Sequence, residues 1–86
     1  MSASLTLSAL PRNAPATVAG VDWNTLAVPE ARRLRELGFD EGVGVEVLHK
    51  TPLGHGPIAC RIGRMTVALR RSVAAAIRVS PLQAAE

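Results

Sequence analysis

The chain has 86 residues, of which 48% are hydrophobic and 20% are charged, and its formal net charge is +3. This length predicts one domain over 1–86, and this composition excludes a wholly disordered chain. No stretch of about 18 residues lacks charge, which excludes a membrane-spanning helix and direct membrane insertion.

The N-terminal part is expected to contain one strand. Residues 5–10 carry three leucines before a proline, and we expect there only a short start or a loosely docked arm. One asparagine and one proline in 12–16 favour a loop. The segment 17–21 (TVAGV) is β-prone and predicts the first strand, in which Gly20 is a candidate bulge or bend.

One helix is predicted over 29–37. A proline at its first position and Glu30 in its first turn are typical of a helix start, and Gly38 is typical of a left-handed helix end. Leu34 and Leu37 share one face of this helix. So short a helix is not stable alone, so this apolar face is expected to pack on a sheet.

The sheet follows from alternating apolar and polar side chains. This alternation predicts strands over 43–48, 58–62 and 65–69. The loop 51–57 between the first two is rich in glycine and proline. Gly63 starts the short connection between the last two, which predicts a tight hairpin turn.

A short turn capped by Ser72 and a last strand over 77–79 complete the chain, and we expect 1–4 and 81–86 to be frayed tails. The predicted fold is mainly β, with five strands and one short helix between strands one and two. A closed or nearly closed barrel is expected, because closure removes exposed edges. The residues predicted to be buried together are Leu34, Leu37, Val45, Val47, Ile62, Val67, Leu69 and Ile77.

The order of these pieces resembles the FeoA family, small cytoplasmic proteins of bacterial ferrous iron uptake. The resemblance covers 5–79 and is carried by two runs, "RRLRELGFDEGVGVEVLHKTPLG" at 32–54 and "RIGRMTVALRRSVAAAIRV" at 61–79. It implies an SH3-like barrel and a cytoplasmic accessory or regulatory protein of ferrous iron transport. It also implies contact with the cytoplasmic GTPase-bearing part of the membrane transporter FeoB.

Three residues depart from the pattern of this family. Glu41 stands where the family usually has proline, Val73 where it usually has an acidic residue, and Asn13 where it often has glycine. These departures concern loop geometry rather than the fold. The same barrel ends some metal-dependent repressors, but we expect no room for a winged helix before it in this chain.

The metal-ligating side chains do not form a recognisable site. Cys60 has the parity of buried strand positions, and a single cysteine makes no internal disulfide. His49 and His55 have no ligand-like spacing to it, so we expect neither a structural metal site nor a cofactor. Weak ferrous iron binding through Asp40, Glu41 or His55 stays open. No nucleophile elbow, P-loop or paired-carboxylate motif occurs, so we expect no enzyme.

The candidate partner-binding residues are basic or lie in a loop. Arg32, Arg33 and Arg35 form either the solvated side of the helix or a docking face for an acidic partner. Leu53 and His55 lie in the glycine-rich loop 51–57 and either fold back on the core or contact the partner. We take all five together as the candidate docking site.

An alternative function rests on the C-terminal third. No acidic residue occurs between Arg61 and Arg78, which predicts a positive face. This favours, as a second hypothesis, a metal-responsive or nucleic-acid-associated small barrel. Aromatic residues are only 2% of the chain, which argues against nucleic acid as a partner, because single strands are bound by stacking on exposed rings.

Overall fold

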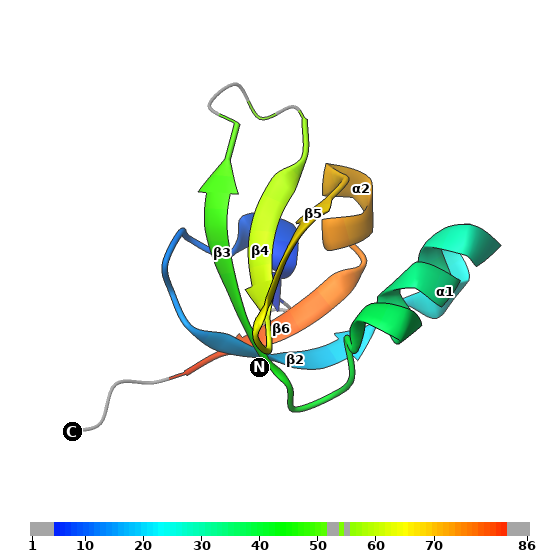
Figure 1. Ribbon diagram of the computed structural model, residues 1–86, viewed down its shortest axis with the longest axis horizontal. Helices are drawn as coiled ribbons and strands as arrows, with labels where there is room; N and C mark the ends of the chain where they lie inside the picture. The colour runs from blue at the N-terminus through cyan, green and yellow to red at the C-terminus, as the bar shows by residue number, and fades with distance from the viewer. Residues whose placement is uncertain (1–4, 52–53, 55, 83–86) are drawn as a thin grey trace.

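The computed structural model describes residues 5–51, 54 and 56–82. One antiparallel sheet contains six strands in the order β1-β6-β2-β3-β4-β5 (Figure 1). The strands are β1 (Leu5–Thr6), β2 (Ala16–Val21), β3 (Gly44–Lys50), β4 (Ile58–Ile62), β5 (Met65–Leu69) and β6 (Ile77–Pro81). Two α-helices, α1 (Val28–Leu37) and α2 (Arg71–Ala74), and two 3-10 turns, η1 (Leu7–Ala9) and η2 (Trp23–Thr25), complete the fold.

The N-terminal segment is part of the core, so the prediction of a loosely docked arm was wrong. Strand β1 pairs with β6, with Leu5 opposite Val79. Leu7 and Leu10 are fully buried. Their spacing of three suits a 3-10 turn, and a two-residue strand is too short to show alternation. The sheet therefore has six strands rather than five, and α1 lies between the second and third of them.

The sheet is curled but not closed, which corrects the expected barrel closure. Its order leaves β1 and β5 as the two edges. Helix α2 lies beside the end of β5, and α1 lies further out on the same side (Figure 1). Leu34 of α1 and Val73 of α2 belong to the core cluster. Helical side chains thus help to cover the interior that a closed barrel would cover with strands.

Two irregularities in the strand register decide which side chains face outward. The pairing of β2 with β6 shifts between Val18 and Gly20, which confirms the predicted bulge. The pairing of β3 with β4 shifts between Val47 and His49. This second shift breaks the alternation, so Val47 is fully buried whereas His49 is exposed.

The ends of both helices follow from local residues. Helix α1 begins at Val28, where the Ala27 N–H donates a hydrogen bond to Oε1 of Glu30 at 3.1 Å. It ends at Gly38, whose φ of +92° confirms the predicted left-handed end. Helix α2 begins at Arg71 without a side-chain cap. Ser72 therefore lies inside its first turn, and the predicted Ser72 cap was wrong.

Asn13 explains one departure from the family pattern. Its φ of +61° lies in the left-handed region, where glycine is favoured and asparagine is the best tolerated substitute. Its N–H donates a hydrogen bond to the Val47 carbonyl at 2.8 Å. The asparagine thus adopts the conformation that a glycine would allow at this turn.

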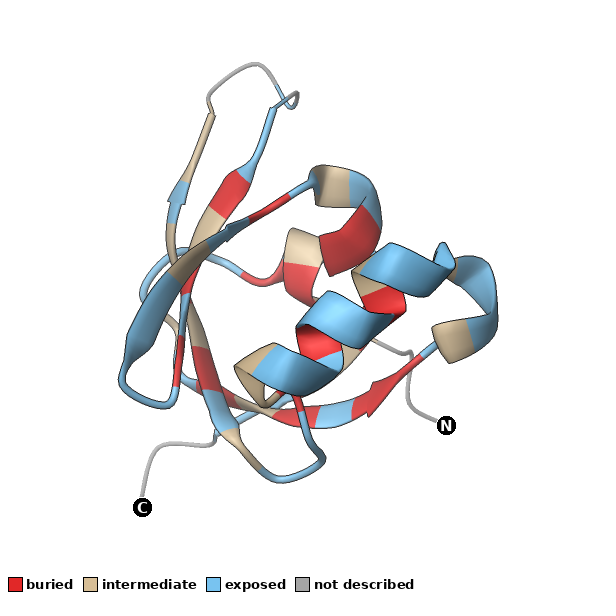
Figure 2. Ribbon diagram, turned by 45° about the vertical axis from the view of Figure 1, so that its right-hand side comes forward, coloured by how far each residue is buried: buried red, intermediate tan, exposed pale blue. Residues whose placement is uncertain are grey.

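Six of the eight residues predicted for the core are buried, and Leu37 and Val67 pack at its margin (Figure 2). Large side chains that the sequence did not single out join them. These are Leu7, Leu10, Phe39 and Ile58. Strand β6 continues to Pro81, past its predicted end at Val79, and the Leu82 N–H donates to the Pro15 carbonyl at 3.0 Å.

Candidate functional site

The structure divides the predicted docking residues between two sides of α1. Arg32, Arg33 and Arg35 are all exposed. Arg32 and Arg35 line one groove, and Arg33 lines another on the opposite flank of the helix. Leu53 and His55 lie outside the described residues. The three arginines therefore line two grooves, one on each flank of α1.

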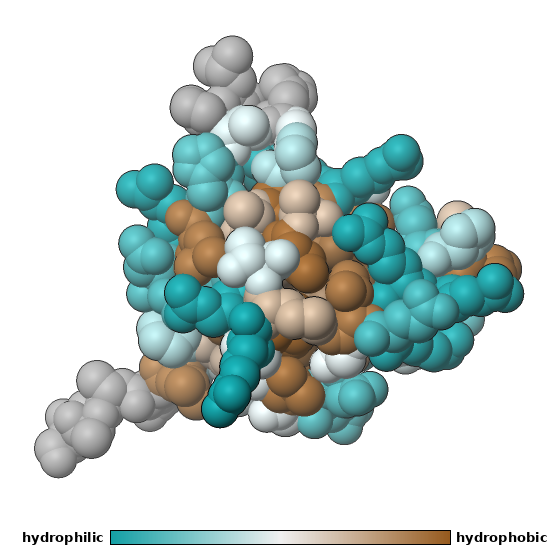
Figure 3. Space-filling view, in the orientation of Figure 1, coloured by the Kyte–Doolittle hydropathy of each residue, from teal (hydrophilic) through white to brown (hydrophobic). Residues whose placement is uncertain are grey.

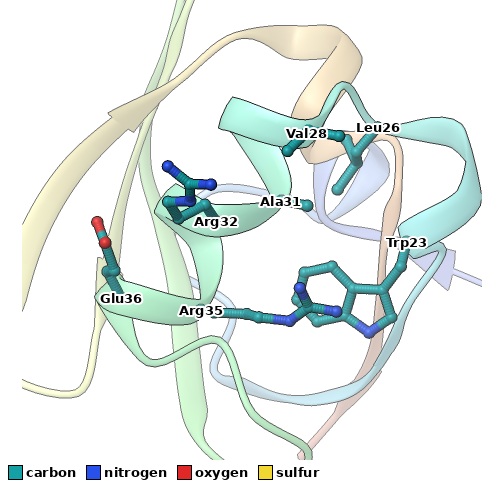
Figure 4. A pocket seen from close by; sticks show the side chains of 7 residues that line it. All are labelled: Trp23, Leu26, Val28, Ala31, Arg32, Arg35 and Glu36. Carbon is teal, nitrogen blue, oxygen red and sulfur yellow. The ribbon is translucent and has the colours of Figure 1, made fainter.

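The first groove, of about 450 Å³, lies between η2 and α1 and is called here the Trp23 groove (Figure 4). It is lined by Trp23, Leu26, Val28, Ala31, Arg32, Arg35 and Glu36. The Arg35 guanidinium carbon stands 4.3 Å from the centroid of the Trp23 ring. Such a cation–π contact holds both side chains in place and leaves the far side of the guanidinium to a partner.

Apolar and aromatic side chains make up four of the seven residues that line the Trp23 groove. Val28 at the start of α1 is 70% exposed. Trp23 and Leu26 are half-buried and pack against the core cluster. Apolar and aromatic side chains beside arginines are the composition that marks the centres of protein interfaces. Sequence reasoning missed Trp23, since only the folded chain brings it under Arg35.

The second groove, of about 410 Å³, lies between α1 and the end of β5 and is called here the β5 groove. Its apolar lining includes the buried side chains of Leu34, Leu69 and Val73. Arg33 from α1 and Arg70 from the end of β5 supply its positive charge, and Glu30 of α1 adds one carboxylate to the lining. Arg33 thus acts with a residue of the C-terminal third rather than with its neighbours on the helix.

The arginines of the C-terminal third are dispersed. Arg61 pairs with Glu46 at 3.7 Å, and Arg78 pairs with Asp22 at 3.2 Å. Surface pairs of this kind contribute little stability, but they offset local positive charge. The other arginines of this segment, Arg64, Arg70 and Arg71, directly precede or follow β5.

Cys60 is fully buried, as predicted from its parity. Burial raises the pKa of its thiol from 9.0 to about 11, so the side chain is neutral at physiological pH. His49 is exposed. Within 5–51, 54 and 56–82, no three His, Cys, Asp or Glu side chains come together as a possible metal site.

The isolated chain is expected to bind neither ferrous iron nor zinc tightly, because Cys60 is a buried neutral thiol and metal ligation needs a thiolate. Anaerobic titration calorimetry measures this directly. One stoichiometric site tighter than micromolar would contradict the expectation, above all if Cys60→Ser abolished it.

The raised pKa of Cys60 also predicts a pH dependence of stability. The folded thiol keeps its proton in the window between 9.0 and about 11, where the unfolded thiol loses it. The stability that the buried thiol contributes to the folded state is therefore fully present below pH 9.0. It is lost as the pH rises towards about 11. Urea unfolding across this window should show a shallower loss for Cys60→Val than for the parent. Equal slopes would contradict the prediction.

No helix among the described residues is both long and apolar enough to cross a membrane. The strand order, the bulges and the filled interior define a small SH3-like β protein with open grooves on its surface. A family model described as the FeoA domain matches residues 5–81. The chain belongs to the FeoA family, which is linked to ferrous iron transport, and this confirms the resemblance found in the sequence.

Several solved structures are similar to the chain. FeoA of Stenotrophomonas maltophilia, crystallised with zinc, is 40% identical with a TM-score of 0.75, over 88% of this chain and 89% of that one. It is described as a prokaryotic SH3 domain protein, with a suggested role as a ferrous iron transport activating factor. FeoA of Chlorobium tepidum is 33% identical with a TM-score of 0.80, over 95% and 74% of the two chains.

Two further similarities are limited in what they show. Iron(II) transport protein A of Clostridium thermocellum is 29% identical with a TM-score of 0.78, and the match covers 91% of this chain but 46% of that one. A manganese-dependent transcriptional repressor shares 24% identity and a TM-score of 0.80, over 95% and 38% of the two chains, which shows a common fold alone. Among curated proteins there is no match.

Proposed function

We propose that the protein is a cytoplasmic accessory protein of ferrous iron uptake that acts by contact with the cytoplasmic GTPase-bearing part of a FeoB-type transporter. Membership of the FeoA family over residues 5–81 is the observation that supports this best. The proposed action is contact rather than catalysis. The interior is filled by fully buried side chains such as Val47 and Ile77, so any function belongs to the outer face and loops.

The Trp23 groove is the surface that suits such a contact. Tryptophan and arginine are the residues that contribute most binding energy at interfaces, and here Arg35 stacks on Trp23. Val28 offers exposed apolar area next to them. Exposed Arg32 adds positive charge that steers an acidic partner towards the groove.

The remaining candidate residues have different parts in the proposal. Arg33 lines the β5 groove, so in this proposal it belongs to a second contact with the transporter rather than to the Trp23 groove. Leu53 and His55, outside the described residues, stay a predicted contact of the loop after β3. The proposed surface is therefore centred on Arg32 and Arg35.

Reversing two charges in the Trp23 groove is expected to slow association with the GTPase-bearing domain. The change is Arg32→Glu with Arg35→Glu, and the association rate should fall by about tenfold at low salt because rim charge steers encounter. The dependence of that rate on salt should also become flatter. Biolayer interferometry against the soluble cytoplasmic domain of the transporter, at two salt concentrations, measures both effects.

Arg12→Glu is the matched control. Arg12 is exposed, and the segment 11–15 lies on the left of Figure 1, opposite α1. Arg12→Glu reverses one charge, half the change of the double variant, in another part of the surface. It should change association by less than about twofold, because screening weakens distant charges. If the double variant binds as the parent does, α1 is not the docking face.

The alternative of a nucleic-acid-associated or metal-responsive barrel has weaker support. The similarity to the manganese-dependent repressor concerns the fold only. Ion pairs with Glu46 and Asp22 offset the charge of Arg61 and Arg78. A salt-dependent mobility shift of duplex DNA on mixing with the protein would favour this alternative over contact with the transporter.

A further inference from the structure

Strand β5 is an open edge of the sheet. It pairs with β4 alone, in an unbroken register from Ile62 opposite Met65 to Ile58 opposite Leu69. In an antiparallel pair joined by a tight turn, hydrogen-bonded positions alternate, so the backbone groups of Thr66 and Ala68 point away from β4. Within the described part of the chain, neither residue has another backbone partner.

This edge lacks the usual protection against a further strand. Residues 65–69 (MTVAL) contain no charge and no proline, and their register with β4 has no bulge. Met65 is 44% exposed, and Thr66 and Ala68 are exposed as well. The opposite edge, β1, has only two residues. Figure 3 shows pale and brown atoms over the face where Figure 1 places β4 and β5, with hydrophilic atoms around them.

An arginine stands at each end of the edge. Arg64 precedes β5 and Arg70 follows it, and both are exposed. In an extended chain they are about 20 Å apart. Two copies of β5 could pair symmetrically about Val67. Arg64 of each copy would then lie opposite Arg70 of the other, at both ends of the strand pair. Like charges directly opposite each other destabilise a strand pair, so a second copy of this chain is a poor occupant.

The β5 groove lies at the C-terminal end of this edge. Leu69 and Arg70 line the groove together with Arg33 and Leu34 of α1. In Figure 2, α1 lies across the β5 groove from the C-terminal end of β5, and α2 lies above α1. A strand added along β5 would therefore reach an apolar depression lined by two arginines and one acidic residue, Glu30, which leaves an excess of positive charge.

We propose that the β5 edge binds an extended segment of another protein by strand addition, and that this segment is acidic at its ends. The backbone of this segment pairs with Thr66 and Ala68. The acidic side chains at its two ends lie near Arg64 and Arg70. An apolar side chain of the segment enters the β5 groove. Main-chain hydrogen bonds supply affinity in this mode of recognition, while the pocket and the two arginines supply selectivity. The site is separate from the Trp23 groove and does not depend on the identity of the transporter.

The test uses a short synthetic peptide of alternating valine and threonine with glutamate at each end. On binding to the full chain, the amides of Thr66 and Ala68 should become protected from hydrogen exchange and shift in a two-dimensional NMR spectrum. Ala68→Pro should weaken binding by at least about tenfold, because it removes an outward donor at a position where an edge strand tolerates proline. Ala68→Thr keeps the donor and is the matched control.

The thermal midpoint of the proline variant shows whether it folds. If it does not fold, a pair of charge reversals provides a second, independent test. Arg64→Glu with Arg70→Glu should weaken the glutamate-ended peptide by about tenfold and strengthen a lysine-ended one. Parent-like binding by a folded Ala68→Pro variant would overturn the proposal, as would equal binding of both peptides to the parent. Protection of Thr66 and Ala68 without peptide, rising with protein concentration, would show self-pairing and also overturn it. No transporter is present, so these outcomes leave docking through α1 unaffected.

Discussion

Leu34→Ala is expected to lower the free energy of unfolding by about 2–4 kcal/mol. Leu34 is 1% exposed and belongs to the core cluster, whereas Leu37 packs only at its margin. It is therefore the main contact that fixes α1 to the rest of the fold. Since small domains have only about 5–15 kcal/mol of stability in total, this loss is large.

Val28→Ala on the same helix is the matched control. Val28 is 70% exposed, so its truncation removes little buried area and should change stability by less than about 0.5 kcal/mol. Urea unfolding followed by far-UV circular dichroism compares the two variants. Equal midpoints would mean that α1 is not docked through Leu34. In that case the Trp23 groove, which needs α1 in place, would not be a fixed surface either.

Local signals were enough to predict most of the sheet and the helix. The alternation in 58–62 and 65–69 and the glycine at Gly63 gave strands whose ends match β4 and β5. Pro29 and Gly38 marked the two ends of a helix that differs from α1 by one residue at its start. Each of these features depends on residues that are close together in the sequence. A short local pattern is therefore enough to predict it.

The features that escaped prediction depend on distant contacts. Strand β1 has two residues and is defined only by its pairing with β6. The bulge near Leu48 could not be placed without the partner strand β4, and it is this bulge that turns His49 outward. Closure of the sheet also depends on how its two edges lie in space.

The candidate site shows the same division. The charge of the helix was evident from its arginines, and helical spacing explains their separation, since Arg32 and Arg35 are three residues apart and share a side. Arg33 is rotated away from them and meets Arg70 across the β5 groove. The stacking of Arg35 on Trp23 joins α1 to the turn η2 and has no counterpart in the sequence pattern.

Leu7→Ala tests whether the N-terminal segment is integral to the fold, and it is expected to cost about 2–5 kcal/mol. Leu7 is fully buried in η1. It lies in the core cluster with side chains from the sheet and from α2, such as Ile77 and Ala74. Its truncation leaves a cavity that the surrounding strands cannot fill without breaking their pairing, so the cost should approach the upper part of this range.

Leu82→Ala is the matched control, because Leu82 is also a leucine near a chain end but is 58% exposed. Its truncation should change stability by less than about 0.5 kcal/mol. A loosely docked arm would make the two substitutions equivalent, whereas the buried turn makes them differ by several-fold in the free energy measured by urea unfolding. Because Lys50 Nζ also donates a hydrogen bond to the Ser8 carbonyl at 2.9 Å, η1 is tied to β3 as well as to the core. Loss of Leu7 should therefore also speed hydrogen exchange at Asn13, whose N–H bonds to β3 just beyond this turn.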